Sequence, residues 1–343
     1  MILKFARQKW FYRLLLALSL VFPLLVTDRY VFQIVTMNLI VAIAALSMNL
    51  ILGYTGQPSL AHAGFFGIGA YGVGLMTRAG LSFWLALPLS SMIAALVGFF
   101  IGLPTLRTRG AYFSIATLCF GVIITIVAGN WTTLTGGHTG ILGIPLPSPI
   151  PFPIAGKIEF TTPAAQYYLV LAFLLLTLFV MHRLVYSLHG LSFMAIRNNE
   201  TLSEAVGINT FATKILSFTV ANFFAGMAGG IYASLIGSIS PSTTSYVLTF
   251  NWLLFIFIGG VATLAGPILG AFVIPVVMEY LQFLENYRLV IFGLMLILII
   301  IYFPRGIIGG IENLQRRVNS YYRRRKDGGE KVVTASGKSH QAV

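Results

Sequence analysis

The run VFQIVTMNLIVAIAALSMNLIL at residues 31–52 decides the fold. It contains no charged residue, and about 20 apolar residues are enough for a helix to cross the hydrocarbon core of a bilayer. Its apolar residues are continuous and do not alternate with polar ones, which favours a helix over a strand of a membrane barrel. The sequence therefore predicts a transmembrane helix here.

The rest of the chain has the same character. Of its 343 residues, 57% are hydrophobic and 9% are charged, whereas soluble domains carry about 25% charged residues; the mean hydropathy is +0.87. We expect an all-α polytopic membrane protein of about ten transmembrane helices, within a range of about eight to ten. The predicted spans lie near 11–27, 31–52, 58–77, 82–103, 110–128, 164–186, 214–237, 246–264, 266–284 and 288–304.

The basic residues predict the orientation. A net charge of +13 would suggest nucleic acid as the partner of a soluble protein. Here the ten-span arrangement places 18 of the 22 lysines and arginines on the side of both termini. Such residues concentrate in the cytoplasm, so both termini are predicted to be cytoplasmic and residues 129–163 external, with no nucleic-acid partner. Residues 1–317 form the predicted transmembrane domain, and residues 318–343 a disordered, basic cytoplasmic tail.

Two glycine patterns resemble nucleotide-binding loops, but neither has the required context. Residues 67–72 read G-x-G-x-x-G, yet they lie in a predicted span, with no strand before them and no acid about 20 residues later. Close packing of helices through small residues explains them better. Residues 337–339 end like a Walker A loop, but Val332 stands where its first glycine belongs. We expect a transport subunit that is not an enzyme and has no ATP site, cofactor or metal of its own.

Residues 197–210 form the most distinctive predicted cytoplasmic segment. Thr201 and Glu204 have the spacing of a capping box, and Gly207 can take the left-handed conformation that ends a helix. These signals predict a short surface helix at about 201–206, whose apolar side chains would be costly to expose without a partner. An ordinary loop helix is the alternative, but the pattern favours a docking element.

Polar side chains within the predicted spans are candidates for a substrate path. In lipid such groups must find partners, so each one is also open to a purely structural role as an interhelical hydrogen bond. His62 is the strongest candidate, because it is a single imidazole among small residues just after a glycine-rich turn. The candidates are Asn38, Asn49, Gln57, Ser59, His62, Asn222 and Asn251.

Several motifs carry a resemblance to a known family. The sequence EAVG at residues 204–207 resembles the Glu-Ala-x-Gly loop by which permeases of ATP-binding-cassette importers dock on their ATPases. Four other stretches resemble the branched-chain amino acid permeases of the LivM type, and their order and spacing match over about residues 38–310. They are GYTGQPSLAHAGFFGIGAY at 53–71, LRTRGAYF at 106–113, LTGG at 134–137 and FPRG at 303–306.

The resemblance implies a fold, partners and roles. It implies an importer-permease bundle in the inner membrane of a bacterium or archaeon, which moves leucine, isoleucine or valine by alternating access. The implied partners are a homologous second permease, two cytoplasmic ATPases and an extracytoplasmic substrate-binding protein. The residues implied to dock on the ATPase are Arg197, Glu200, Thr201, Glu204, Ala205 and Gly207.

Two alternatives differ in function. Related permeases import urea or short amides, so the substrate is open between these and amino acids. A secondary transporter or channel driven by an ion gradient is the alternative of another class, and it would usually need several charged relay groups within the spans. Glu279 fits that role best among the residues of the predicted spans, although it lies toward the outer end of its span.

Overall fold

A computed structural model of the protein describes residues 22–23, 28–108, 110–152 and 156–280, together with residues 291, 293, 294, 297, 301 and 306–309. The predicted spans near 11–27 and 288–304 fall largely outside the described residues, and the predicted tail at 318–343 lies wholly outside them.

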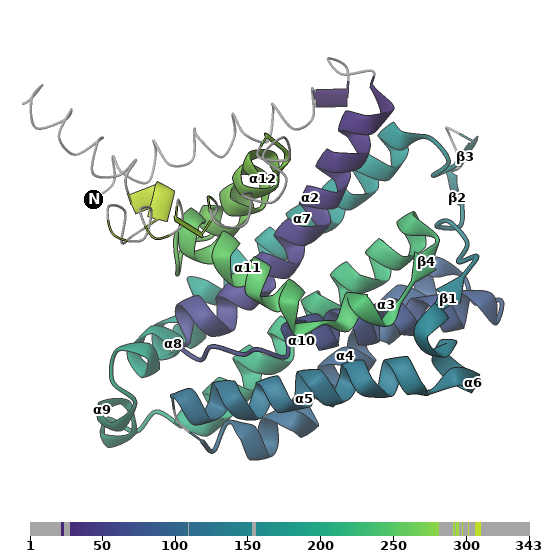
Figure 1. Ribbon diagram of the computed structural model, residues 1–343. Helices are drawn as coiled ribbons and strands as arrows, with labels where there is room; N and C mark the ends of the chain where they lie inside the picture. Colours follow the sequence, from purple (N-terminus) through teal and green to yellow (C-terminus); the bar gives the residue numbers. More distant parts are fainter. Residues whose placement is uncertain are drawn as a thin grey trace, which may run out of the picture.

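The described chain is mostly helical (Figure 1). Its α-helices are α2 (Arg29–Asn49), α3 (His62–Arg78), α4 (Phe83–Thr105), α5 (Ala111–Asn130), α6 (Thr132–Thr135), α7 (Pro163–Val185), α8 (Leu188–Asn198), α9 (Glu200–Ala205), α10 (Thr210–Ile236), α11 (Tyr246–Gly259) and α12 (Ala265–Tyr280). A π-helix, η1 (Leu50–Tyr54), continues α2, and two 3-10 turns are η2 (Gly137–Thr139) and η3 (Pro241–Thr244). The strands are β1 (Ile141–Leu142), β2 (Ile150–Phe152), β3 (Gly156–Ile158) and β4 (Ser238–Ile239).

Helix α2 is the centre of one half of the bundle. It begins where the side chain of Asp28 accepts a hydrogen bond from the backbone N–H of Tyr30, which satisfies a donor that has no partner within the helix. It packs against α7, α10 and α12, and most of its side chains from Leu39 to Asn49 are buried. The transmembrane helix predicted from residues 31–52 is therefore confirmed, and it extends into η1.

The second half is built on α3, α4 and α10, which pack tightly together. The three glycines of the 67–72 pattern each meet a different element. A Cβ on Gly67 would overlap Thr244 of η3, one on Gly69 would overlap the backbone of Gly226 in α10, and one on Gly72 would lie 2.7 Å from Cβ of Ser90 in α4. The pattern thus serves close helix packing, as predicted.

Two small antiparallel ribbons lie at the ends of these helices. Strand β1 pairs with β4, placing Ile141 opposite Ile239, and β2 pairs with β3, placing Ile150 opposite Ile158. The hydroxyl of Ser234, near the end of α10, donates to the carbonyl of Pro145. The long segment between α5 and α7 is therefore fastened to the end of α10 where that helix meets β4 (Figure 1).

The described residues hold five helices that are long and apolar enough to cross a membrane, the first of them comprising α2 and η1 together. Helices α11 and α12 are shorter apolar helices. The predicted span 58–77 shrinks to α3, because residues 55–61 leave the helical path before His62. The predicted span 246–264 likewise ends at Gly259, where Gly260 takes a φ of 132°. The chain is thus a multi-pass helical membrane protein.

Close packing of α3 on α10 should make Gly69 intolerant of even one methyl group. Gly69→Ala should lower the melting temperature of the purified protein, because the new Cβ overlaps the carbonyl of Gly226 and overpacking costs about 1–3 kcal/mol. Gly129→Ala is the matched control, since its Cβ would meet only the ring of His138, at 3.4 Å. Equal melting temperatures for the two variants in detergent would contradict this account of the packing.

Candidate docking and translocation sites

The predicted docking segment, residues 197–210, comprises the end of α8, all of α9 and the first residue of α10. Helix α8 ends at Asn198, and α9 begins at Glu200 after a sharp turn. The predicted capping box is wrong: the side chain of Asn199 caps α9 by accepting from the N–H of Leu202, and the hydroxyl of Thr201 donates to that same side chain. Asparagine caps a helix at least as well as threonine does. Asn199 directly precedes the first residue of α9 and provides the cap in place of Thr201.

The end of α9 agrees with its prediction. Gly207 has a φ of 87°, and its N–H donates to the carbonyl of Glu204 while that of Ile208 donates to Ser203. This pair of bonds defines a Schellman motif. The carboxylate of Glu204 accepts a hydrogen bond from the hydroxyl of Thr210 at the start of α10, which ties α9 to the following span.

Lys214 also belongs to this site, although it was not among the residues predicted from the sequence. Its side chain is 4% exposed, and its Nζ lies 2.7 Å from a carboxylate oxygen of Glu200 and 3.1 Å from the carbonyl of Leu106. A buried cation requires such partners. The three groups join the first residue of α9, the first turn of α10 and the end of α4. The sequence offered one signal for this ion pair: a lysine at the first position of the predicted span 214–237, 14 residues after a glutamate.

The surface of this segment is apolar. Leu202 and Val206 are 62% and 69% exposed, and Leu188 and Leu191 on α8 are exposed as well. Arg197, Thr201, Glu204, Ala205 and Gly207 also lie at the surface, whereas Glu200 is half-buried against Lys214. Exposed apolar side chains grouped on a short capped helix are typical of an interaction site.

The end of α8 also contacts the turn that precedes the candidate path. Gly56 has a φ of 75°, and a Cβ there would lie 3.0 Å from Cγ and 3.3 Å from Cα of Arg197. Glycine is needed at this position both for its conformation and for its closeness to α8. The docking segment and the turn that leads to His62 are therefore in direct contact.

Beyond Gly56 the chain runs as a buried irregular segment to His62. The hydroxyl of Thr117 on α5 accepts from the N–H of Leu60, and that of Ser114 donates to the carbonyl of Pro58. The side-chain oxygens of Gln57 and Ser59 are buried and make no hydrogen bond with the described residues. Side chains from α5 thus hold the backbone, while two polar groups in the segment stay available for another partner.

His62 is fully buried at the first position of α3. Its Nε2 lies 2.9 Å from the hydroxyl of Ser47, which itself donates to the carbonyl of Ala44. Nδ1, the other ring nitrogen, is buried and makes no hydrogen bond with the described residues. The ring meets Trp252 of α11 edge-on, at 6.1 Å between centroids.

Asn49 has both of its side-chain groups occupied. Its Oδ1 accepts from the N–H of Ala262, and its Nδ2 donates to the carbonyl of Thr263, at 3.1 and 2.8 Å. Gly53 permits the approach, since a Cβ there would overlap the side chain of Asn49. The two hydrogen bonds of Asn49 therefore hold the turn between α11 and α12 against α2. This is the structural role that the sequence left open for each polar residue of the spans.

Of the other three predicted asparagines, Asn38 is buried in α2, and the remaining two differ from each other. Asn222 of α10 is fully buried against Gly98 of α4, and both of its polar side-chain atoms lack a hydrogen-bond partner among the described residues. Asn251 lies on the exposed face of α11, so the structure does not bring it together with the others. An unpaired buried amide costs several kcal/mol in an apolar setting, roughly 2–7 by transfer data.

Glu279, the acid that an ion-driven mechanism would use, is exposed near the end of α12. Its carboxylate accepts a hydrogen bond of 2.9 Å from the hydroxyl of Tyr30 at the start of α2. Glu279 is therefore hydrogen-bonded to Tyr30, and it lies near the end of α12, in agreement with its predicted place toward the end of a span. Among the residues that the structure describes, no group of three or more His, Cys, Asp or Glu side chains could hold a metal ion.

The apolar helices and the buried polar residues that they carry define a multi-pass membrane protein. Its chain is irregular between η1 and α3. A family model described as "Branched-chain amino acid transport system / permease component" matches residues 30–300. The chain belongs to this family and is a permease component.

Individual relatives agree with this family assignment. The chain is 31% identical to the "High-affinity branched-chain amino acid transport system permease protein LivM" of Escherichia coli (strain K12), and equally to that of Salmonella typhimurium (strain LT2), over 88% of this chain and 75% of each relative. It is 27% identical to the "Autoinducer 2 import system permease protein LsrC" of Yersinia pestis (strain Pestoides F), over 76% of this chain and 74% of that one. No solved structure matches the chain significantly.

The contacts of Asn49 and Asn251 predict opposite outcomes for the same substitution. Asn49→Ala should lower the free energy of unfolding by about 1–3 kcal/mol, because it leaves the N–H of Ala262 and the carbonyl of Thr263 without their partner. Asn251→Ala should change it little, since that side chain is exposed. Thermal unfolding in detergent measures both, and an unchanged transition for Asn49→Ala would contradict the structural role.

Proposed function

We propose that this permease imports branched-chain amino acids as the membrane subunit of an ATP-driven importer. The similarity to LivM over 88% of the chain is the observation that carries the proposal. In it, the chain pairs with a second permease, two cytoplasmic ATPases supply the energy, and an extracytoplasmic binding protein delivers leucine, isoleucine or valine in the inner membrane of a bacterium or archaeon. The ten-span arrangement with cytoplasmic termini belongs to the proposal.

Helices α8 and α9 are the proposed docking segment for the ATPase. Leu202 and Val206 present an apolar surface, and the cap at Asn199 and the turn at Gly207 fix its shape. The ion pair of Lys214 with Glu200 and its bond to the carbonyl of Leu106 link the segment to α4 and α10. A push on α9 is thereby passed to two spans.

A second route leads from α8 to the proposed path. Arg197 packs on Gly56, and the buried segment after Gly56 ends at His62. Movement of α8 therefore displaces the turn before α3. Gln57, Ser59, His62 and Asn222 are the proposed path residues, because each keeps a buried polar atom unpaired within the described chain. Asn49 and Asn251 are left out of this path.

The alternatives have weaker support. Urea or short amides would use the same architecture, but the named relatives transport branched-chain amino acids or autoinducer 2. An ion-driven transporter would need intramembrane acids, and Glu279 is exposed near a helix end and paired with Tyr30.

Uptake by the reconstituted importer tests the function and the docking segment together. Proteoliposomes holding this chain and its partner subunits should accumulate radiolabelled leucine with ATP inside and binding protein outside, and urea should not compete. Leu202→Ser should reduce both uptake and recovery of the ATPase by pull-down. Leu142→Ser is the matched control, because the two leucines are 62% and 61% exposed. Normal ATPase recovery with Leu202→Ser would remove α9 from the docking surface.

The contact between Gly56 and Arg197 predicts a variant that docks but does not transport. Gly56→Ala should keep ATPase recovery and lose most uptake per assembled complex, because the methyl group pushes on α8. Gly80→Ala controls for backbone strain, since Gly80 has a φ of 93° with open space around it. Equal uptake by both variants would show that the Arg197 contact is not on the route.

Path residues should affect transport more than assembly. Asn222→Leu removes an unpaired buried amide and keeps much of its volume, so stability should be kept or improved. If the amide contacts the substrate, uptake per complex should nevertheless fall strongly, as it should for His62→Ala. The measurement is leucine uptake divided by the amount of complex recovered. Full uptake by both variants would exclude these two residues from the path.

A further inference from the structure

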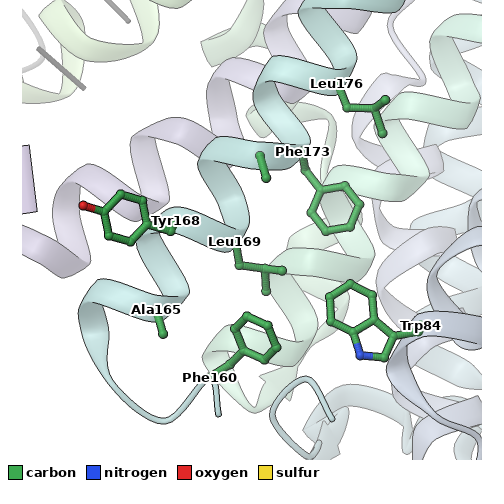
Figure 2. Close-up of a pocket in the computed structure, with 8 residues that line it drawn as sticks. Trp84, Phe160, Ala165, Tyr168, Leu169, Phe173 and Leu176 are labelled. Atoms are coloured by element: carbon green, nitrogen blue, oxygen red, sulfur yellow. The ribbon is translucent and has the colours of Figure 1, made fainter. Parts of the chain in front are cut away.

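A hollow outside the proposed path lies along α7 (Figure 2). Its volume is about 610 Å³, and the rings of Trp84, Phe160 and Phe173 gather around it with Leu169 between them (Figure 2). The lining is completed by residues of α7, namely Ala165, Tyr168, Ala172 and Leu176. The hollow lies between the start of α4, the loop before α7 and the first half of α7.

The chemistry of the lining excludes an amino acid as the occupant. No charged side chain lines the hollow, and the indole N–H of Trp84 already donates to the carbonyl of Ser148. A zwitterion would lose its hydration there without receiving partners in exchange. The occupant must be apolar.

The length of the hollow matches one leaflet of a bilayer. From Ala165 to Leu176 the lining of α7 rises about 17 Å, close to one leaflet of a hydrocarbon core of about 30 Å.

The position of the hollow agrees with an occupant from the bilayer. Trp84 is the second residue of α4, and Phe160 precedes α7 by three residues, so two aromatic rings close one end of the hollow where the spans begin. Tryptophan is enriched at that level of a membrane. Toward the middle of α7 the wall becomes open, with Leu176 48% exposed.

We propose that this hollow is a binding site for one acyl chain of a membrane phospholipid. The chain enters with its headgroup near Trp84 and Phe160, and its tail follows α7 to Leu176. It lies against Trp84 at the start of α4 and the residues of α7 that line the hollow. The site is separate from the proposed path and does not depend on the transported substrate.

Photolabelling tests the proposal on the full chain. Proteoliposomes of phosphatidylcholine with a diazirine on one acyl chain are irradiated, and labelled peptides are quantified by mass spectrometry. Labelling of residues 165–176 should exceed labelling of the exposed face of α5 severalfold. Ala172→Phe, which fills the hollow, should reduce it to the level of α5, whereas Cys119→Phe, which adds a ring at an exposed position of α5, should leave it unchanged.

Three results would overturn the proposal. Equal labelling of the hollow and of α5 in the unaltered chain would mean ordinary contact with bulk lipid. Strong labelling of the chain alone that disappears when the other importer subunits are co-reconstituted would mean that a protein covers the hollow. Ala172→Phe that labels like the unaltered chain would place the acyl chain elsewhere. Retained preference of 165–176 in the assembled complex supports the site.

Discussion

Backbone that leaves the helical path inside a bilayer must find its hydrogen-bond partners within the protein, and much of this structure follows from that constraint. The segment between η1 and α3 is held by Thr117 and Ser114 of α5, and the N–H of Ala63 donates to the hydroxyl of Thr249 on α11. The turn after α11 is held by Asn49 of α2. Each irregular stretch therefore fixes the position of a neighbouring helix.

The close packing of the helices also depends on glycines at their contacts. Helices α3, α4 and α10 approach through Gly69, Gly98 and Gly226, where a side chain would overlap the neighbouring helix. Close approach gains van der Waals contacts that lipid cannot replace. The result is a closely packed group of three helices, next to the irregular segment between η1 and α3.

Residue patterns predicted most of the helices and the correct family, because continuous apolar runs and glycine spacings are local features. They failed where tertiary contacts decide. Residues 58–61 belong to the predicted span 58–77, yet the carbonyl of Pro58 and the N–H of Leu60 bond to side chains of α5 instead of continuing a helix. Asn199 displaces Thr201 as the cap of α9 because two capping residues compete. Asn49 and Asn222 look alike in sequence, and only the surrounding helices make one a paired structural residue and the other an unpaired candidate.

The buried cation at Lys214 has a consequence for biogenesis. One of its two partners, the carbonyl of Leu106, precedes it by 108 residues, and the other, Glu200, by 14. Both acceptors are therefore synthesised before Lys214. Synthesis in this order spares the lysine from waiting in an apolar setting, whereas a chain that lost Glu200 would present the quality-control proteases with an uncompensated charge at that junction.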